Sequence, residues 1–220
     1  NILVVTNIYP PQELGGYGRS IADFAWGLKE RGHSLQVLCS DTKELGASTS
    51  LGPSGESVDR RLKLKGSYTG GVKHIEDQSK RNQIDEQNIK LIRQWLNIKK
   101  WEGILLGNLD LLGTELLSVL LEANCKIQHH VGFVHPPFPA SAWPASSNYQ
   151  MVAASQAVRS ALIQGGMPTN NITVIYPGAR TEKFEKKVTG IHDPLAADGS
   201  QRRPLTAGSA GFVMMSQCIH

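Results

Sequence analysis

The sequence predicts an α/β domain: a Rossmann-like, doubly wound and mostly parallel sheet with helices on both faces. Short, continuous runs of apolar and β-branched residues recur along the 220-residue chain, as expected of strands buried on both faces of a parallel sheet. Segments with apolar residues at helical spacing separate these runs. Hydrophobic residues make up 40% and charged residues 19% of the composition, which is typical of a globular protein with a sizeable core.

The first 40 residues predict a strand–helix–strand unit. Ile2–Thr6 is a short apolar run and is expected to form the first strand. Apolar residues from Ile21 to Leu28 share one face of a helix, and Gly32 is suited to end it. Leu35–Cys39 is the next strand, so the helix crosses between two parallel strands in the right-handed sense.

The middle of the chain is less regular. Thr42–Ser57 is rich in Gly, Ser and Thr, which predicts a mobile insertion with little to bury. Val58–Leu64 alternates charged and apolar residues and is expected to be an edge strand. Ile84–Leu96 has helical spacing.

The remainder predicts further strand–helix alternation. Ser155 is a suitable N-cap for a helix that ends at Gly165–Gly166. The other expected elements are strands over Ile104–Leu106, Ile127–Val131, Met151–Ala154 and Ile172–Ile175, and a helix over Glu115–Glu122. Ligands of such sheets bind beyond the carboxyl ends of the strands, so the loops after strands are where functional residues are expected.

The loop after the first strand carries the clearest functional signal. Gly15, Gly16 and Gly18 fall within four residues, immediately before an amphipathic helix. Glycine lets a ligand approach the backbone closely, and the free N–H groups of a helix start attract anions. We therefore expect a diphosphate to bind here, with Arg19 as a charge partner.

Two alternatives stay open for this loop. It can be a helix-entry loop without a ligand, or a nicotinamide dinucleotide site. Asp41 lies about 20 residues beyond the glycines, where a ribose-binding acid would be expected. Against the dinucleotide site, Ile21 replaces the third glycine of the motif, and eight residues separate Thr6 from Gly15, too many for a tight turn.

Several motifs together resemble family 4 of the retaining glycosyltransferases, which have the two-domain GT-B fold. Ile2–Asp41, with its Tyr-Pro-Pro, Gly-Gly-x-Gly and Arg-Gly-His (Arg31–His33), resembles the start of the family's first domain. Met151–Ser155, Gly165–Pro168 and Val174–Gly178 resemble the end of the same domain. The chain departs from the family pattern where Pro177 replaces an Asn and Arg180 an Asp.

The resemblance implies a domain organisation and an activity. Residues 1–185 would form the acceptor-side, N-terminal half of a GT-B fold, and residues 186–220 a linker and the start of the nucleotide-sugar-binding domain. The implied reaction is transfer of a sugar from a nucleotide-diphosphate-sugar to a hydroxyl acceptor with retention. The basic pair and the two glutamates that grip the nucleotide in this family belong to the second domain, so we expect the given chain to be inactive alone. A non-catalytic interaction module is a further alternative.

The resemblance also implies roles for particular residues. His135 matches the family's histidine beside the sugar donor and would bind the transferred sugar or stabilise its developing charge. The glycines and Arg19 would bind the donor phosphates. The residues expected to line the acceptor side or the cleft are Tyr17, Asn108, Asp110 and Ser155.

The composition limits the kinds of partner that the chain is expected to bind. The formal charge is +4 with scattered Lys and Arg, which argues against nucleic acid but leaves open peripheral contact with an anionic membrane surface. Cys39, Cys125 and Cys218 are widely spaced without a C-x-x-C pair, which favours a reducing cytoplasm over a disulfide framework or zinc site.

We expect neither a cofactor nor a metal. The adjacent His129 and His130 point to opposite faces of a strand and cannot bind one ion together. A carboxylate pair suited to a diphosphate-bound Mg²⁺ is not evident in the sequence. The resemblance implies instead a nucleotide-sugar donor and an acceptor that is a glycan, a lipid or a small molecule.

Overall fold

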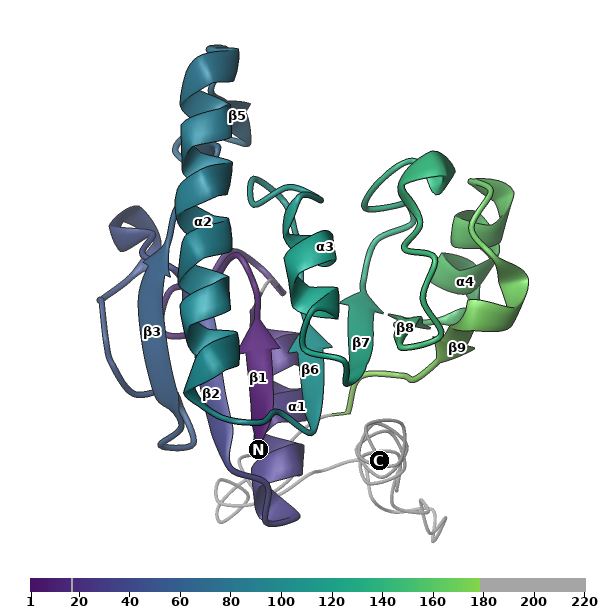
Figure 1. Ribbon diagram of the computed structural model, residues 1–220, viewed down its shortest axis with the longest axis horizontal. Helices are drawn as coiled ribbons and strands as arrows, with labels where there is room; N and C mark the ends of the chain where they lie inside the picture. Colours follow the sequence, from purple (N-terminus) through teal and green to yellow (C-terminus); the bar gives the residue numbers. More distant parts are fainter. Residues whose placement is uncertain (17, 179–220) are drawn as a thin grey trace, which may run out of the picture.

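The computed structural model describes residues 1–16 and 18–178, which form an α/β domain around a seven-stranded sheet. The strand order is β3-β2-β1-β6-β7-β8-β9, and every neighbouring pair is parallel (Figure 1). The predicted Rossmann-like, doubly wound fold is confirmed. The strands are β1 (Ile2–Val5), β2 (Leu35–Ser40), β3 (Ser57–Leu62), β6 (Gly103–Leu106), β7 (Lys126–Val131), β8 (Tyr149–Ala153) and β9 (Ile172–Val174).

Helices cover both faces of this sheet. Helix α1 (Arg19–Glu30) lies behind the sheet in Figure 1, and α2 (Gln78–Ile98) and α3 (Leu116–Leu121) lie in front of it. Helix α4 (Gln156–Gln164) packs into the same core as α2 and α3. Single-turn 3₁₀ helices η1, η2 and η3 lie at Lys43–Leu45, Ala140–Ala142 and Thr169–Asn171.

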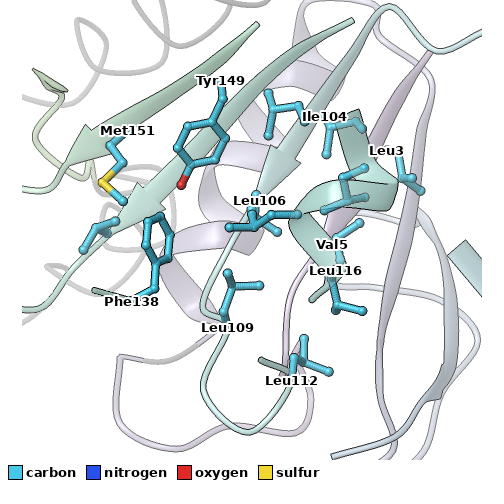
Figure 2. Close-up of a cluster of buried hydrophobic side chains, with 14 of the residues drawn as sticks. Leu3, Val5, Ile104, Leu106, Leu109, Leu112, Leu116, Phe138, Tyr149 and Met151 are labelled. Atoms are coloured by element: carbon cyan, nitrogen blue, oxygen red, sulfur yellow. The ribbon is translucent and has the colours of Figure 1, made fainter. Parts of the chain in front are cut away.

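Side chains of the central strands alternate between two cores. Leu3 and Val5 of β1 face α2 and α3, whereas Ile2 and Val4 pack with the apolar side of α1. Figure 2 shows the larger core, where Leu106 and neighbouring side chains fill the space between the sheet and α3. Strands buried on both faces explain the continuous apolar runs in the sequence.

Two elements differ from the prediction. A small antiparallel hairpin, β4 (Gly66–Ser67) with β5 (Lys73–His74), lies outside the main sheet and was not predicted. Helix α2 begins six residues earlier than the expected Ile84, at Gln78. It does so because the Asp77 carboxylate accepts hydrogen bonds from the backbone N–H groups of Ser79 and Lys80, at 2.8 and 3.2 Å.

The insertion after β2 buries more than expected. Glu56 is only 3% exposed; its carboxylate accepts hydrogen bonds from the Tyr9 hydroxyl at 2.5 Å and the Ser54 N–H at 2.9 Å. The expectation of little to bury is therefore wrong, because this segment packs against the loop after β1. Val58–Leu64 does begin as an edge strand, β3, as predicted.

The strand order places a crevice beside β1. The chain leaves β1 for β2 on one side, while β6 pairs with β1 on the other, so the connections diverge at the carboxyl ends of β1 and β6. Ligands of open α/β sheets bind at such a point. The expected domain boundary at 185/186, and Arg180 with it, lie outside the described residues.

Candidate functional site

A pocket of about 790 Å³ opens at the carboxyl ends of the central strands. The arrowheads of β1, β6 and β7 point to this edge of the sheet (Figure 1). Its walls come from the loops after β1, β6 and β7 and from the ends of the last two strands. The lining residues are Leu14, Gly15, Gly16, Gly18, Ser20, Ile21, Asn108, Asp110, His129, His130, Val131, Gly132, Phe133, His135, Pro136, Pro137, Ala154 and Pro177.

The glycines of the first loop have different structural duties. Gly18 has φ +70° and a Cβ there would lie 2.7 Å from the Ile8 carbonyl oxygen, so a side chain cannot be accommodated without movement. Gly15 also has a positive φ, of +59°, but a Cβ on Gly15 or Gly16 would meet nothing within 4 Å. Gly18 is therefore needed by the fold, and Gly15 and Gly16 leave open space at the pocket wall.

The start of α1 forms the floor beside these glycines. Gly18 is the N-cap residue, and its carbonyl accepts the first helical hydrogen bond, from the Ala22 N–H at 2.8 Å. The N–H groups of the first turn have no acceptor within their own helix, and the helix dipole adds partial positive charge. Ser20 and Ile21 of this turn line the pocket, which therefore has an anion-attracting end.

Arg19 does not share this wall. Its guanidinium forms an ion pair with Glu13, and the side chain is 63% exposed. The hydrogen bond to Glu13 raises the pKa of Arg19. The expected contact between Arg19 and donor phosphates is therefore not supported by its position.

The loop after β6 contributes polar side chains. Asn108 and Asp110 both line the pocket, as expected, and the Asn108 amide donates a hydrogen bond of 3.3 Å to the Asp110 carboxylate. The buried Asn7 holds this loop to the one after β1, because its amide donates to the Tyr68 hydroxyl at 2.6 Å and to the Asp110 carbonyl at 3.3 Å. Two pocket walls are thus joined beneath the surface.

The end of β7 places two histidines at the base of the pocket. Burial lowers the pKa of His129 to about 3 and that of His130 to about 4, so both imidazoles are neutral at pH 7. His129 Nδ1 lies 2.5 Å from the Tyr149 hydroxyl, whereas the His130 ring packs on Phe24 with centroids 5.0 Å apart. The two rings face opposite sides of the sheet, as predicted. That both residues line the pocket was not predicted.

His135 also lines the pocket, in an exposed part of the loop after β7. Phe138, only 4% exposed, anchors this loop; its ring centroid lies 6.4 Å from those of both Trp143 and Tyr149. Aromatic packing thus fixes the loop that brings His135 to the pocket.

Two expected site residues are not brought to the pocket. Ser155 lies outside its lining, and its hydroxyl accepts a hydrogen bond of 3.2 Å from the Val158 N–H as the N-cap of α4. Its hydroxyl thus has a structural role as a helix cap, and its expected place at the cleft stays a prediction. Tyr17 lies outside the described residues.

Two kinds of feature are absent from the described residues. Across residues 1–16 and 18–178, no three His, Cys, Asp or Glu side chains are grouped so that they could hold a metal ion. Within the same ranges, no helix combines the length and apolar character needed to cross a bilayer.

Solved structures share the fold, although no family model and no curated protein matches the sequence. A UDP-N-acetylglucosamine 2-epimerase matches with a TM-score of 0.52 and 10% identity over 79% of this chain and 47% of its own. The corresponding enzyme of Rickettsia bellii gives 0.50 and 11% over 80% and 44%. Alr3699/HepE of Anabaena, solved with UDP and glucose, gives 0.48 and 17% over 81% and 44%.

The two likenesses with TM-scores of 0.52 and 0.50 establish the fold. The chain spans less than half the length of each of these structures and matches one half of a GT-B fold. At such low identity, the activity is a separate question that depends on the site.

Proposed function

We propose that this chain is the acceptor-side domain of a GT-B glycosyltransferase. The complete enzyme would transfer a sugar from a nucleotide-diphosphate-sugar to a hydroxyl acceptor with retention. One observation carries the proposal: three loop glycines (Gly15, Gly16 and Gly18), the first turn of α1 and His135 all line one pocket at the switch point of the sheet.

The glycine wall suits a leaving diphosphate. Negative charge grows on the diphosphate as the glycosidic bond breaks, and fixed N–H donors stabilise that charge without reorganising. Gly15 and Gly16 leave room for the phosphates, and the first turn of α1 supplies donors and the positive end of a dipole. The second domain that the resemblance implies would supply the cations.

Polar side chains elsewhere in the pocket lining are able to bind sugars. His135 would donate a hydrogen bond to the transferred sugar or stabilise its developing positive charge. Asn108 and Asp110 offer amide and carboxylate groups that bind hydroxyls of an acceptor, and Tyr17 is assigned to the same side by its place in the sequence. None of these roles requires a metal ion or a further cofactor.

The donor to test first is a UDP-sugar. The solved structures that share the fold with TM-scores of 0.52 and 0.50 are enzymes named for UDP-N-acetylglucosamine. The acceptor and a peripheral membrane contact stay predictions.

The decisive experiment measures UDP release and product configuration with a polypeptide that includes the second domain. We expect release that depends on an acceptor, a product with the donor's anomeric configuration, and loss of most activity in His135→Ala. The chain of 220 residues alone should release no UDP. Epimerised sugar formed without an acceptor would instead assign an epimerase, and a rise of NADH fluorescence on binding would assign a nicotinamide enzyme. Absence of every one of these activities would favour a non-catalytic interaction module.

A further inference from the structure

Arg60 of the edge strand β3 reaches across to the loop that leads into the glycines. Its guanidinium donates to the Tyr9 carbonyl at 3.0 Å and to the Pro10 carbonyl at 2.7 Å. It also donates to the Gln12 side-chain oxygen at 3.1 Å and, through Nε, to the Thr49 carbonyl at 2.9 Å. One side chain therefore ties β3, the insertion after β2 and the loop after β1 together.

Together these hydrogen bonds of Arg60 form a clamp on the backbone segment that Gly18 contacts. Gly18 packs against the backbone of the clamped segment, since a Cβ there would lie 2.7 Å from the Ile8 oxygen and 3.3 Å from Tyr9 Cα. The segment that Arg60 grips is thus the surface on which the first turn of α1 rests. A shift of Tyr9 and Pro10 would move the N–H groups that face the pocket.

The clamp also orients the backbone dipoles. Carbonyl oxygens are negative ends of peptide dipoles and repel phosphate, whereas N–H groups attract it. Arg60 engages the Tyr9 and Pro10 carbonyls from the side of β3 and so keeps them occupied. Gln12 reinforces the arrangement, because its side-chain oxygen also accepts from the Thr42 N–H at 2.9 Å.

We propose that Arg60 is a positioning residue for a diphosphate at the glycine turn, acting through the backbone of Tyr9 and Pro10. The inference rests on the proposed function, since it presumes that an anion binds there. It requires arginine in particular: a planar guanidinium can serve several carbonyls at once, whereas a lysine ammonium cannot reproduce the fork.

The next residue is a matched control. Arg61 is 63% exposed and pairs with Asp59 rather than with the loop. Replacing it removes the same charge from the same strand without touching the clamp.

Inorganic pyrophosphate is the probe, titrated into the 220-residue chain while the amide resonances of Gly15, Gly16 and Gly18 are followed by NMR. We expect these amides to shift in the unaltered chain. Arg60→Met should raise the dissociation constant of pyrophosphate about tenfold, the scale of one charged hydrogen bond. The dissociation constant of Arg60→Lys should lie between those of Arg60→Met and the unaltered chain. That of Arg61→Met should stay within about twofold of the unaltered chain, because surface ion pairs contribute little.

Thermal unfolding of each variant separates positioning from stability. The proposal requires Arg60→Lys to remain folded at the titration temperature and still bind pyrophosphate more weakly than the unaltered chain. If Arg60→Met unfolds at that temperature, Arg60→Lys alone decides the outcome. Equal binding by the Arg60 variants and the unaltered chain would overturn the positioning role and leave the proposed function standing. An equal loss in Arg61→Met would overturn it too. Unmoved glycine amides in the unaltered chain would remove the anion site itself, and the inference with it.

Discussion

Gly16 and Gly18 are two residues apart but differ in what a side chain would meet. Gly16 has open space around its Cβ position, whereas Gly18 combines a positive φ with a 2.7 Å approach to Ile8. We predict that Gly16→Val leaves the free energy of unfolding unchanged and abolishes pyrophosphate binding, because the isopropyl group occupies the ligand's space. Gly18→Val should lower the free energy of unfolding by about 2 kcal/mol or more.

Denaturant unfolding and the amide titration together check this pair. Gly16→Ala is the graded control, since a single methyl group takes up less of the pocket. Full pyrophosphate binding by Gly16→Val would show that the open space beside this residue is not where the anion lies.

The buried histidines at the end of β7 predict a pH dependence of stability. Their pKa values in the folded chain, about 3 for His129 and about 4 for His130, lie below the ordinary value of 6.5. Between these pH values the unfolded chain binds more protons than the folded chain, so acid favours unfolding. The free energy of unfolding should be constant above about pH 7 and fall below it, by at most about 1.4 kcal/mol per pH unit for each histidine.

Denaturant unfolding between pH 7 and pH 5 measures this slope. His130→Phe removes one titrating group while keeping a ring against Phe24, and should make the slope shallower. His74→Gln, at an exposed position, should leave it unchanged. An identical slope in all three chains would assign the acid sensitivity to other groups.

At the scale of elements, variants of the residues that cap α4 and α2 are expected to change the stability of the chain and not its binding of pyrophosphate. Ser155→Ala should lower the free energy of unfolding by about 1 kcal/mol, because the Val158 N–H loses its acceptor. Pyrophosphate binding should not change, since Ser155 lies outside the pocket lining. Asp77→Ala, which uncaps α2, is the matched variant and should behave in the same way. A binding defect in Ser155→Ala alone would return this residue to the site.

The elements that the sequence predicted are those whose signals are local. Most strands of the main sheet contain a short apolar run, β3 shows alternating charged and apolar residues, and the α4 cap is one serine before a periodic segment. The β4–β5 hairpin and the ordered insertion were missed because they depend on distant partners. Glu56 is buried by Tyr9, 47 residues away in sequence, and Asn7 meets Tyr68 across 61 residues.

The same distinction applies to the site. Gly15, Gly16 and Gly18, Asn108, Asp110 and His135 lie in loops that follow strands, so the fold class alone predicts that they meet at one edge of the sheet. The ion pair of Arg19 with Glu13 could not be read from the spacing of the motif, and a contact of Arg19 with phosphate stays a prediction. Arg60 gave no local signal at all, since an arginine on an alternating edge strand is expected to face solvent.

At the scale of the whole molecule, the pocket exists because the chain reverses its direction of sheet growth beside β1. Strands β2 and β3 extend the sheet on one side, and β6 to β9 extend it on the other. The loops after β1 and β6 must therefore separate, and the loop after β7 closes the opening between them. The pocket is lined by three loops, and Gly15 in the first lies 120 residues before His135 in the third.

Hydrogen exchange tests this arrangement as a unit. At pyrophosphate concentrations of ten times the dissociation constant, openings that release the ligand should become about tenfold rarer. Amides of residues 14–16 and 18–21, where the proposal places the anion, should show the largest slowing. Those of residues 108–110 should follow through the Asn7 hydrogen bonds that join the two loops. Helix α2 contributes no residue to the pocket lining and serves as the internal reference. Slowing confined to the first loop would mean that the walls of the pocket open independently, and equal slowing in α2 would mean that the anion stabilises the chain without occupying the crevice.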